Sequence, residues 1–253
     1  MDRWSHDVSP PADAAGLRYL AVAARLVDRL VTEEWPNIEA AARLVAEALE
    51  AGRRVHVFGT GHSHLLAEEL FYRAGGLVQV HPLLFEGLML HASAPLSTSL
   101  ERLPGLADAL LLDHPIGAGE VLIIASNSGG NAVTSELAQR VRRDGAQVVA
   151  VTSLQHATSP SARPTGGPRL HELADVVIDN GGCVGDAAVD IAGFDRRVAP
   201  TSTVIGAAIL NAVVAQAVEL LVDRGVAPEV YRSSNTQDGD AANARFAPPG
   251  TVR

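Results

Sequence analysis

Short, mainly apolar runs alternate with segments of helical composition along the chain. Such runs are typical of strands buried on both faces of a parallel sheet. They lie at residues 54–58, 77–84, 121–124, 147–152 and 175–179. Segments of helical composition lie at residues 65–73, 132–144 and 204–222. Strands that alternate with helices predict an α/β fold with a parallel sheet and right-handed crossovers.

Two amphipathic helices are expected before the first strand. Apolar residues recur at intervals of three and four at Leu17, Leu20, Ala24, Val27 and Val31. A second helix, at residues 36–49, begins with Pro36 and is ended by Gly52. We therefore expect loose residues at 1–12, an N-terminal helical extension at 1–50, a main domain at 51–246 and a disordered tail at 247–253.

Three loops rich in hydroxyl groups each lead into a predicted helix. A helix amino-terminus offers backbone N–H groups and the positive end of its dipole to an anion, and glycines let the main chain approach it. These loops therefore predict a phosphate site. Its candidate residues are Gly59, Thr60, Gly61, Ser63, Ser126, Asn127, Ser128, Gly129, Asn131, Thr201, Ser202 and Thr203.

The three loops together carry a family resemblance. GTGHS at 59–63, SNSGGN at 126–131 and APTSTVIGAAILNA at 199–212 resemble the sugar isomerase (SIS) domain, which binds phosphorylated sugars. NSGGNAV, VVAVTSLQHA, GDAAVDI and the tail SSNTQDGDAAN are similar to a phosphosugar-binding branch of these proteins, related to phosphoheptose isomerases. The resemblance covers residues 15–246. It implies a three-layer α/β/α sandwich with a mainly parallel five-stranded sheet.

The resemblance also implies a partner. In SIS proteins the leading helical pair packs against another subunit, so a homodimer or a dimer of dimers is expected. The alternative is that these two helices only cover the sheet of their own chain. The sequence alone does not choose between the two.

Composition narrows the class of ligand and location. The formal net charge of −9 argues against nucleic acids and acidic membranes as partners. All 20 basic residues are arginine, which excludes a Schiff-base lysine and a P-loop lysine. No segment is long and uniformly apolar enough to cross a bilayer, no secretory signal is visible, and Cys183 is the single cysteine. A cytoplasmic protein is therefore expected.

Two other kinds of site are disfavoured. Gly59-Thr60-Gly61 begins like a dinucleotide fingerprint, but His64 stands at the position of the third glycine. His62 and His64 could share a metal ion, but no third ligand is evident. We therefore expect no cofactor and no metal.

Candidate acid–base groups follow the first loop. Aldose–ketose isomerisation needs a group that moves a proton between C1 and C2. Glu68 and Glu69 lie in AEEL, and phosphoheptose isomerases have a similar AEEL about one turn further along, with one glutamate as the base. His62 lies within the loop. Glu86 and His91 follow a predicted strand, although a core or interface role for His91 is the simpler interpretation.

The tail adds two candidates through the resemblance. Asn235 and Asp238 are expected to close over the sugar hydroxyls, with surface hydrogen bonding as the alternative. The sequence thus predicts a protein that binds a phosphorylated sugar and isomerises it. The alternatives are a phosphosugar etherase or deaminase and a non-catalytic phosphosugar-sensing protein.

Overall fold

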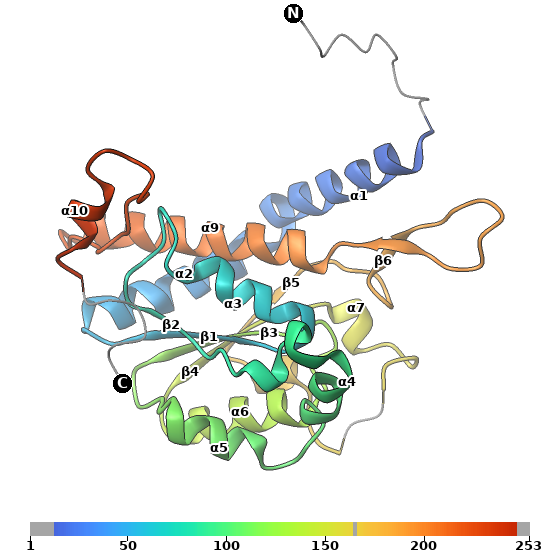
Figure 1. Cartoon of the computed structure of the whole chain (residues 1–253), viewed down its shortest axis with the longest axis horizontal. Helices are drawn as coiled ribbons and strands as arrows, with labels where there is room; N and C mark the ends of the chain where they lie inside the picture. Colours follow the sequence, from blue (N-terminus) through green and yellow to red (C-terminus); the bar gives the residue numbers. More distant parts are fainter. Residues whose placement is uncertain (1–12, 164–165, 247–253) are drawn as a thin grey trace, which may run out of the picture.

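A central sheet of five parallel strands organises the chain (Figure 1). The computed structural model describes residues 13–163 and 166–246, so the segments expected to be loose at 1–12 and disordered at 247–253 lie outside the described residues. The strands are β1 (Val55–Gly59), β2 (Val80–Pro82), β3 (Val121–Ala125), β4 (Gln147–Thr152) and β5 (Val176–Asp179). Their order is β2-β1-β3-β4-β5, and every pair is parallel. The predicted sheet is therefore confirmed.

Helices cover both faces of this sheet, as the predicted sandwich requires (Figure 1). They are α1 (Ala15–Arg29), α2 (Trp35–Glu50), α3 (His64–Leu70), α4 (Leu90–Leu100), α5 (Leu106–Asp113), α6 (Ala132–Arg143), α7 (Leu154–Ala157), α8 (Leu170–Leu173), α9 (Ser202–Asp223) and α10 (Gly239–Asn243). Three short turns are a π-helical turn η1 (Leu30–Glu34) and the 3₁₀ turns η2 (Gly61–Ser63) and η3 (Glu86–Leu88). A hairpin of β6 (Ala187–Val189) and β7 (Val198–Pro200) projects beside the start of α9 (Figure 1).

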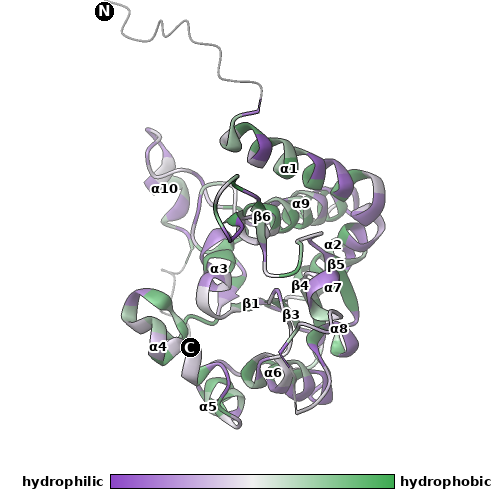
Figure 2. Cartoon of the chain, turned by 90° about the vertical axis from the view of Figure 1, so that its right-hand side faces the viewer, coloured by the Kyte–Doolittle hydropathy of each residue, from purple (hydrophilic) through white to green (hydrophobic). Residues whose placement is uncertain are grey.

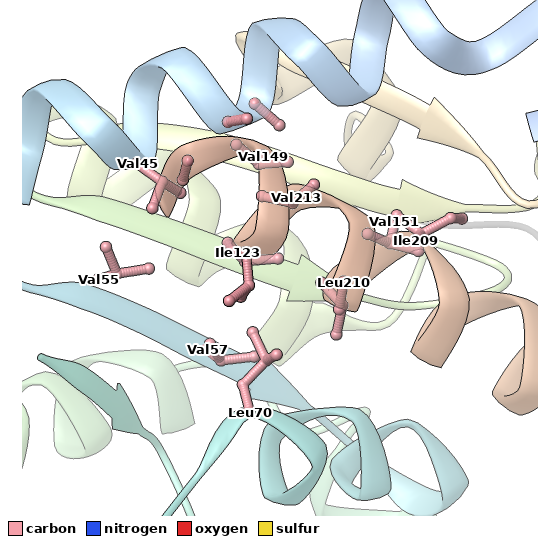
Figure 3. Packing of buried hydrophobic residues seen from close by; sticks show 14 of the residues in the cluster. Val45, Val55, Val57, Leu70, Ile123, Val149, Val151, Ile209, Leu210 and Val213 are labelled. Atoms are coloured by element: carbon pink, nitrogen blue, oxygen red, sulfur yellow. The ribbon is translucent and has the colours of Figure 1, made fainter. Parts of the chain in front are cut away.

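Alternation along the strands divides the core into two layers. Val55 and Val57 of β1 belong to the cluster on the side of α2 and α9, which also contains Val45, Ile209 and Val213 (Figure 3). Phe58 of the same strand points to the opposite side, into the cluster that includes α5 and α6. Each side chain on the central strands is thus buried on one side or the other, which explains their almost continuous apolar runs.

Helix α9 changes one conclusion drawn from the sequence. Among the described residues it is long and apolar enough to cross a membrane by length and composition, although we expected no such segment. Eight of its residues are buried, and its neighbours include α2 and α3 beside the sheet. Packing against the sheet accounts for its apolar composition, because a helix buried in a protein core can be as apolar as one that spans a membrane.

Three elements differ from the sequence prediction. The strand expected at residues 77–84 is limited to Val80–Pro82, because Leu77 pairs with Val230 of the tail instead. The helix expected to reach residue 73 ends at Leu70, since Phe71 is extended and Tyr72 has a φ of +42°. The β6–β7 hairpin was not predicted, because its two strands are only three residues long.

The π-helical turn joins α1 and α2 to the carboxyl end of β5. Glu34 in this turn is buried, and its carboxylate accepts the backbone N–H of Asp179 at 3.1 Å. Arg29 pairs with both carboxylates, at 3.3 Å from Glu34 and 3.0 Å from Asp179. A buried carboxylate is costly unless it is paired, and these contacts satisfy it. The junction is therefore tied to the edge of the sheet where β5 ends.

A buried histidine, His56, lies near the amino end of β1. His56 is 3% exposed, and its Nε2 lies 3.2 Å from Oε2 of Glu120. Burial lowers the pKa of His56 to about 4, and Glu120 opposes that shift only in part. Burial also lowers the pKa of the neighbouring His81, whose ring centroid lies 5.9 Å from that of His56. The ring of His56 is therefore held neutral in the folded protein at mild acidity.

We predict that this histidine makes folding sensitive to acid. The unfolded chain binds a proton at His56 near the ordinary pKa of 6.5, whereas the folded chain does so only near 4. The unfolded state therefore gains protons first, and the free energy of unfolding falls as the pH drops through this window. The free energy of unfolding should be about 2 kcal/mol lower at about pH 5 than at about pH 8. Denaturant unfolding at both pH values measures it, and His56→Gln should show a smaller loss. An equal loss in both proteins would refute this origin.

Candidate functional site

A pocket opens where the carboxyl ends of the strands meet the amino-terminus of α9. Figure 2 views the molecule from this side. The free space at the pocket, with the open solvent in front of it included, is about 240 Å³. Its lining residues are Ser63, Leu66, Ala125, Ser126, Asn127, Val151, Asn180, Ser202 and Thr203. The strand order places β1 next to β3, and ligands of open α/β sheets bind outside the carboxyl ends at such a point.

The lining consists of neutral hydrogen-bonding groups on an apolar base. Ser63, Ser126, Ser202 and Thr203 supply four hydroxyls, and two asparagines supply carboxamides. None of the lining residues is charged. The 22-residue helix α9 begins at Ser202, so the positive end of its dipole lies at the pocket. Such an arrangement binds an anion without a basic side chain.

The first loop is tightly wound around Gly59. A Cβ atom added there would lie 2.3 Å from the carbonyl oxygen of Ser63, so no other residue fits without movement of the loop. Gly61 has a φ of +57°, which also favours glycine. Thr60 turns away from the pocket lining and donates its hydroxyl to Oε2 of Glu101 at 2.9 Å. Ser63 is therefore the residue of this loop that lines the pocket.

The second loop is held by its neighbours on both sides. Ser126 Oγ accepts the N–H of Gly129 at 3.2 Å, and Asn127 Oδ1 accepts Nδ2 of Asn180 at 3.0 Å. Arg169 donates from Nη1 to the carbonyl oxygen of Ser128 at 3.0 Å. Ser126 and Asn127 line the pocket, whereas Ser128, Gly129 and Asn131 form the turn and the start of α6 behind it. The arginine brings a positive charge next to the loop.

The third loop is partly occupied by a carboxylate of the protein itself. Asp186 Oδ1 accepts the N–H groups of Thr201 at 3.1 Å and Ser202 at 2.9 Å. Thr201 is buried, while Ser202 and Thr203 line the pocket. The first amides of α9 thus already have an acceptor, and the side chains of Ser202 and Thr203 are what this loop presents.

Titratable side chains gather next to Ser63. His64 is buried, its Nδ1 contacts the carbonyl oxygen of Gly61, and its Nε2 lies 3.6 Å from Oε1 of Glu68. The ring centroids of His64 and His91 are 5.9 Å apart, so α3 and α4 bring these side chains together. Glu68 is 46% exposed, which leaves its carboxylate accessible. The cluster contains both an imidazole and a carboxylate, the usual groups for general acid–base catalysis.

Comparison with known proteins identifies the family. The family model of the SIS domain matches residues 18–153, more than half of the chain. The chain belongs to the SIS domain family. The resemblance inferred from the three loops is therefore confirmed.

Relatives of this SIS protein match it over most of its length. A UPF0309 protein of Listeria monocytogenes serotype 4b (strain CLIP80459) is 43% identical over 225 residues, which cover 89% of this chain and 91% of that protein. A UPF0309 protein of Geobacillus kaustophilus is 41% identical over 220 residues, covering 87% and 88%.

Two solved structures share the fold of this SIS protein. The phosphoheptose isomerase of Neisseria gonorrhoeae superposes with a TM-score of 0.51 at 15% identity, covering 82% of this chain and 97% of that chain. The phosphoheptose isomerase of Francisella tularensis gives 0.52 at 14% identity, covering 79% and 94%. At these identities the likeness shows the fold alone.

The structure of this SIS domain keeps some predicted residues away from the pocket. Glu69 pairs with Arg73 and accepts a hydrogen bond from Nδ2 of Asn211 at 2.7 Å, so its carboxylate points toward α9. Glu86 is exposed at the start of η3, and within the described ranges it has no hydrogen bond or ion pair through its carboxylate. His62 is exposed on η2, next to Ser63.

Asn235 and Asp238 lie at the opposite end of α9 from the pocket. The tail begins after Asp223, the last residue of the helix, and α10 lies at that end of the molecule (Figure 1). A 22-residue helix is about 33 Å long. Within a single chain, these two side chains therefore do not reach the ligand expected in the pocket.

Sequence reasoning missed several residues of the site. Asn180 directly follows β5, so the rule that ligands bind at carboxyl ends of strands could have found it. Arg169 and Glu101 carry no local signal, because contacts with distant loops bring them to the site. Within residues 13–163 and 166–246, no group of three or more His, Cys, Asp or Glu side chains is arranged to hold a metal ion.

Proposed function

We propose that this protein binds a phosphorylated sugar through its phosphoryl group and isomerises the sugar by proton transfer. The observation that carries the proposal is the pocket of four hydroxyls and two carboxamides at the start of α9. Several neutral donors around one small space suit the oxygens of a phosphoryl group. Membership of the SIS family and the shared fold with two phosphoheptose isomerases support the same class of ligand.

The proton transfer is assigned to the cluster of His64, Glu68 and His91. Ser63 of the pocket directly precedes His64, and the proposal requires the sugar to extend from the phosphoryl site toward this cluster. Isomerisation requires a base that removes the proton from one carbon and returns it to the next. Glu68 is the proposed base because its carboxylate is accessible, whereas that of Glu69 is held by Arg73 and Asn211.

We also propose that a second copy of the chain covers α1. No residue of α1 is buried, and Leu17, Leu20, Ala24, Val27 and Val31 form an exposed stripe along α1 and the turn that follows it. Leu20 is 62% exposed and Val31 is 69% exposed. Alternating intervals of three and four residues are the spacing of a helix that packs against another helix. The same stripe on a second copy provides a self-complementary partner.

The phosphoryl site predicts a specific thermal shift. A sugar phosphate at about 100 times its dissociation constant adds about 2.7 kcal/mol of stability, which raises the unfolding midpoint by roughly 5 to 10 °C. The measurement is a melting curve with hexose, amino-sugar and heptose phosphates, each beside its unphosphorylated parent. Ser126→Ala should weaken the shift, while Ser234→Ala, at the far end of α9, serves as the matched control. Equal shifts from the parent sugars would contradict a phosphoryl site.

The assigned base predicts a separation of binding from turnover. Glu68→Gln should lower kcat by about 10²- to 10⁴-fold while ligand binding remains, since general base catalysis contributes about that much. Glu69→Gln should change kcat far less, because this carboxylate is held by α3 and α9. A coupled assay on the sugar phosphate that gives a thermal shift measures both variants. If Glu69→Gln lowers kcat more than Glu68→Gln does, Glu69 is the base instead. If the native protein binds the sugar phosphate without turnover, the protein is a phosphosugar sensor and not an isomerase.

The exposed stripe predicts a change in assembly. Leu20→Glu places a charge in the proposed helix pair and should convert a dimer to a monomer in sedimentation experiments. Leu112→Glu is the matched control, because Leu112 is 88% exposed on α5, away from the stripe. A monomeric native protein, or a Leu20→Glu variant that sediments as the native dimer, would refute the proposed interface.

A further inference from the structure

Asp186 reaches the pocket indirectly, through a serine. Besides accepting the amides of Thr201 and Ser202 through Oδ1, it accepts the hydroxyl of Ser202 through Oδ2. Its own backbone N–H donates to the carbonyl oxygen of Cys183 at 2.9 Å, in a turn where Asp186 has a φ of +68°. A left-handed conformation is uncommon for a residue other than glycine and persists only where its surroundings hold it. The three accepted bonds provide that support.

The contact with Ser202 determines what this hydroxyl offers to a ligand. A serine hydroxyl has a single proton and two lone pairs. Because the proton is given to Asp186, Ser202 presents only lone pairs to the pocket that it lines. One of the four hydroxyls is therefore a hydrogen-bond acceptor, while the others remain free to donate.

We propose that Asp186, acting through Ser202, makes the pocket select an anion that carries a proton. This inference rests on the proposed phosphoryl site. An inorganic phosphate ion at neutral pH has at least one P–OH group, which donates to Ser202. A sulfate ion has none, so its oxygen faces the lone pairs of Ser202 and two acceptors are left unpaired. A sugar phosphate binds here as its monoanion, whose remaining proton has a pKa of about 6.

Asp186 is thus a positioning residue and not a catalytic one. It caps α9, and the same carboxylate orients the hydroxyl of Ser202. Replacement by asparagine separates these two roles. The carbonyl oxygen of the new side chain still accepts the amides of Thr201 and Ser202, but its NH₂ group donates toward Ser202 Oγ. The hydroxyl of Ser202 is then released to donate into the pocket.

The experiment compares two probes, inorganic phosphate and inorganic sulfate, by isothermal titration on the native full-length protein and on Asp186→Asn. The native protein should bind phosphate at least about tenfold more tightly than sulfate, the effect of an unpaired acceptor. Asp186→Asn should tighten sulfate binding and bring the ratio of the two affinities close to one. Asp190→Asn is the matched control: Asp190 is an exposed partner of Arg197, and its replacement removes the same charge without contact to Ser202.

A second substitution tests the route through the hydroxyl. In a Ser202→Ala background, Asp186→Asn should leave the phosphate-to-sulfate ratio unchanged, because no hydroxyl remains to be reoriented. A ratio that still changes there would show that the charge of Asp186 acts directly. The melting temperature of each variant verifies that the cap on α9 persists.

The outcomes separate this inference from the function on which it rests. If the native protein binds phosphate and sulfate equally, or if Asp186→Asn leaves their ratio unchanged, the selectivity is refuted and the phosphoryl site stands. If neither anion nor any sugar phosphate binds, both the site and its selectivity are overturned.

Discussion

Burial of the parallel sheet on both faces is the constraint on which the rest of the structure depends. Once α2 and α9 cover one face and α5 and α6 the other, the strands have no polar side to offer a ligand. Polar chemistry is confined to the loops at the edges of the sheet. Because all five strands are parallel, the loops after β1, β3 and β5 and the start of α9 meet at one edge. The pocket is a direct consequence of that topology.

The pocket reconciles a negatively charged protein with an anionic ligand. Its donors are hydroxyls, carboxamides and a helix dipole, and the guanidinium of Arg169 holds the carbonyl of Ser128 next to the lining. Asp186 adds a negative charge at the very helix end that would attract the anion. Neutral donors and a nearby carboxylate favour an anion of limited charge, which is consistent with a ligand that retains one proton.

Local patterns in the sequence predicted the elements that bury most apolar surface. The runs at β1, β3 and β4 and the glycine at position 59 were sufficient to locate the sheet and two of the loops. The features that these patterns do not predict depend on contacts between distant segments. The carboxylate of Glu69 accepts a hydrogen bond from Asn211, and Asp186 accepts the first amides of α9. Leu77 pairs with Val230 of the tail. No periodicity in the sequence reports these pairings.

Helix α9 explains why, within a single chain, the tail does not contact the pocket. The helix starts at the pocket and continues without a break for 22 residues, so it acts as a rigid spacer of about 33 Å between Ser202 and the tail. Residues that are close to the motif in sequence are thereby carried to the opposite edge of the sheet. Motifs along the chain therefore identify the family. Which of their residues lie together at one site depends on the length and direction of the helices between them.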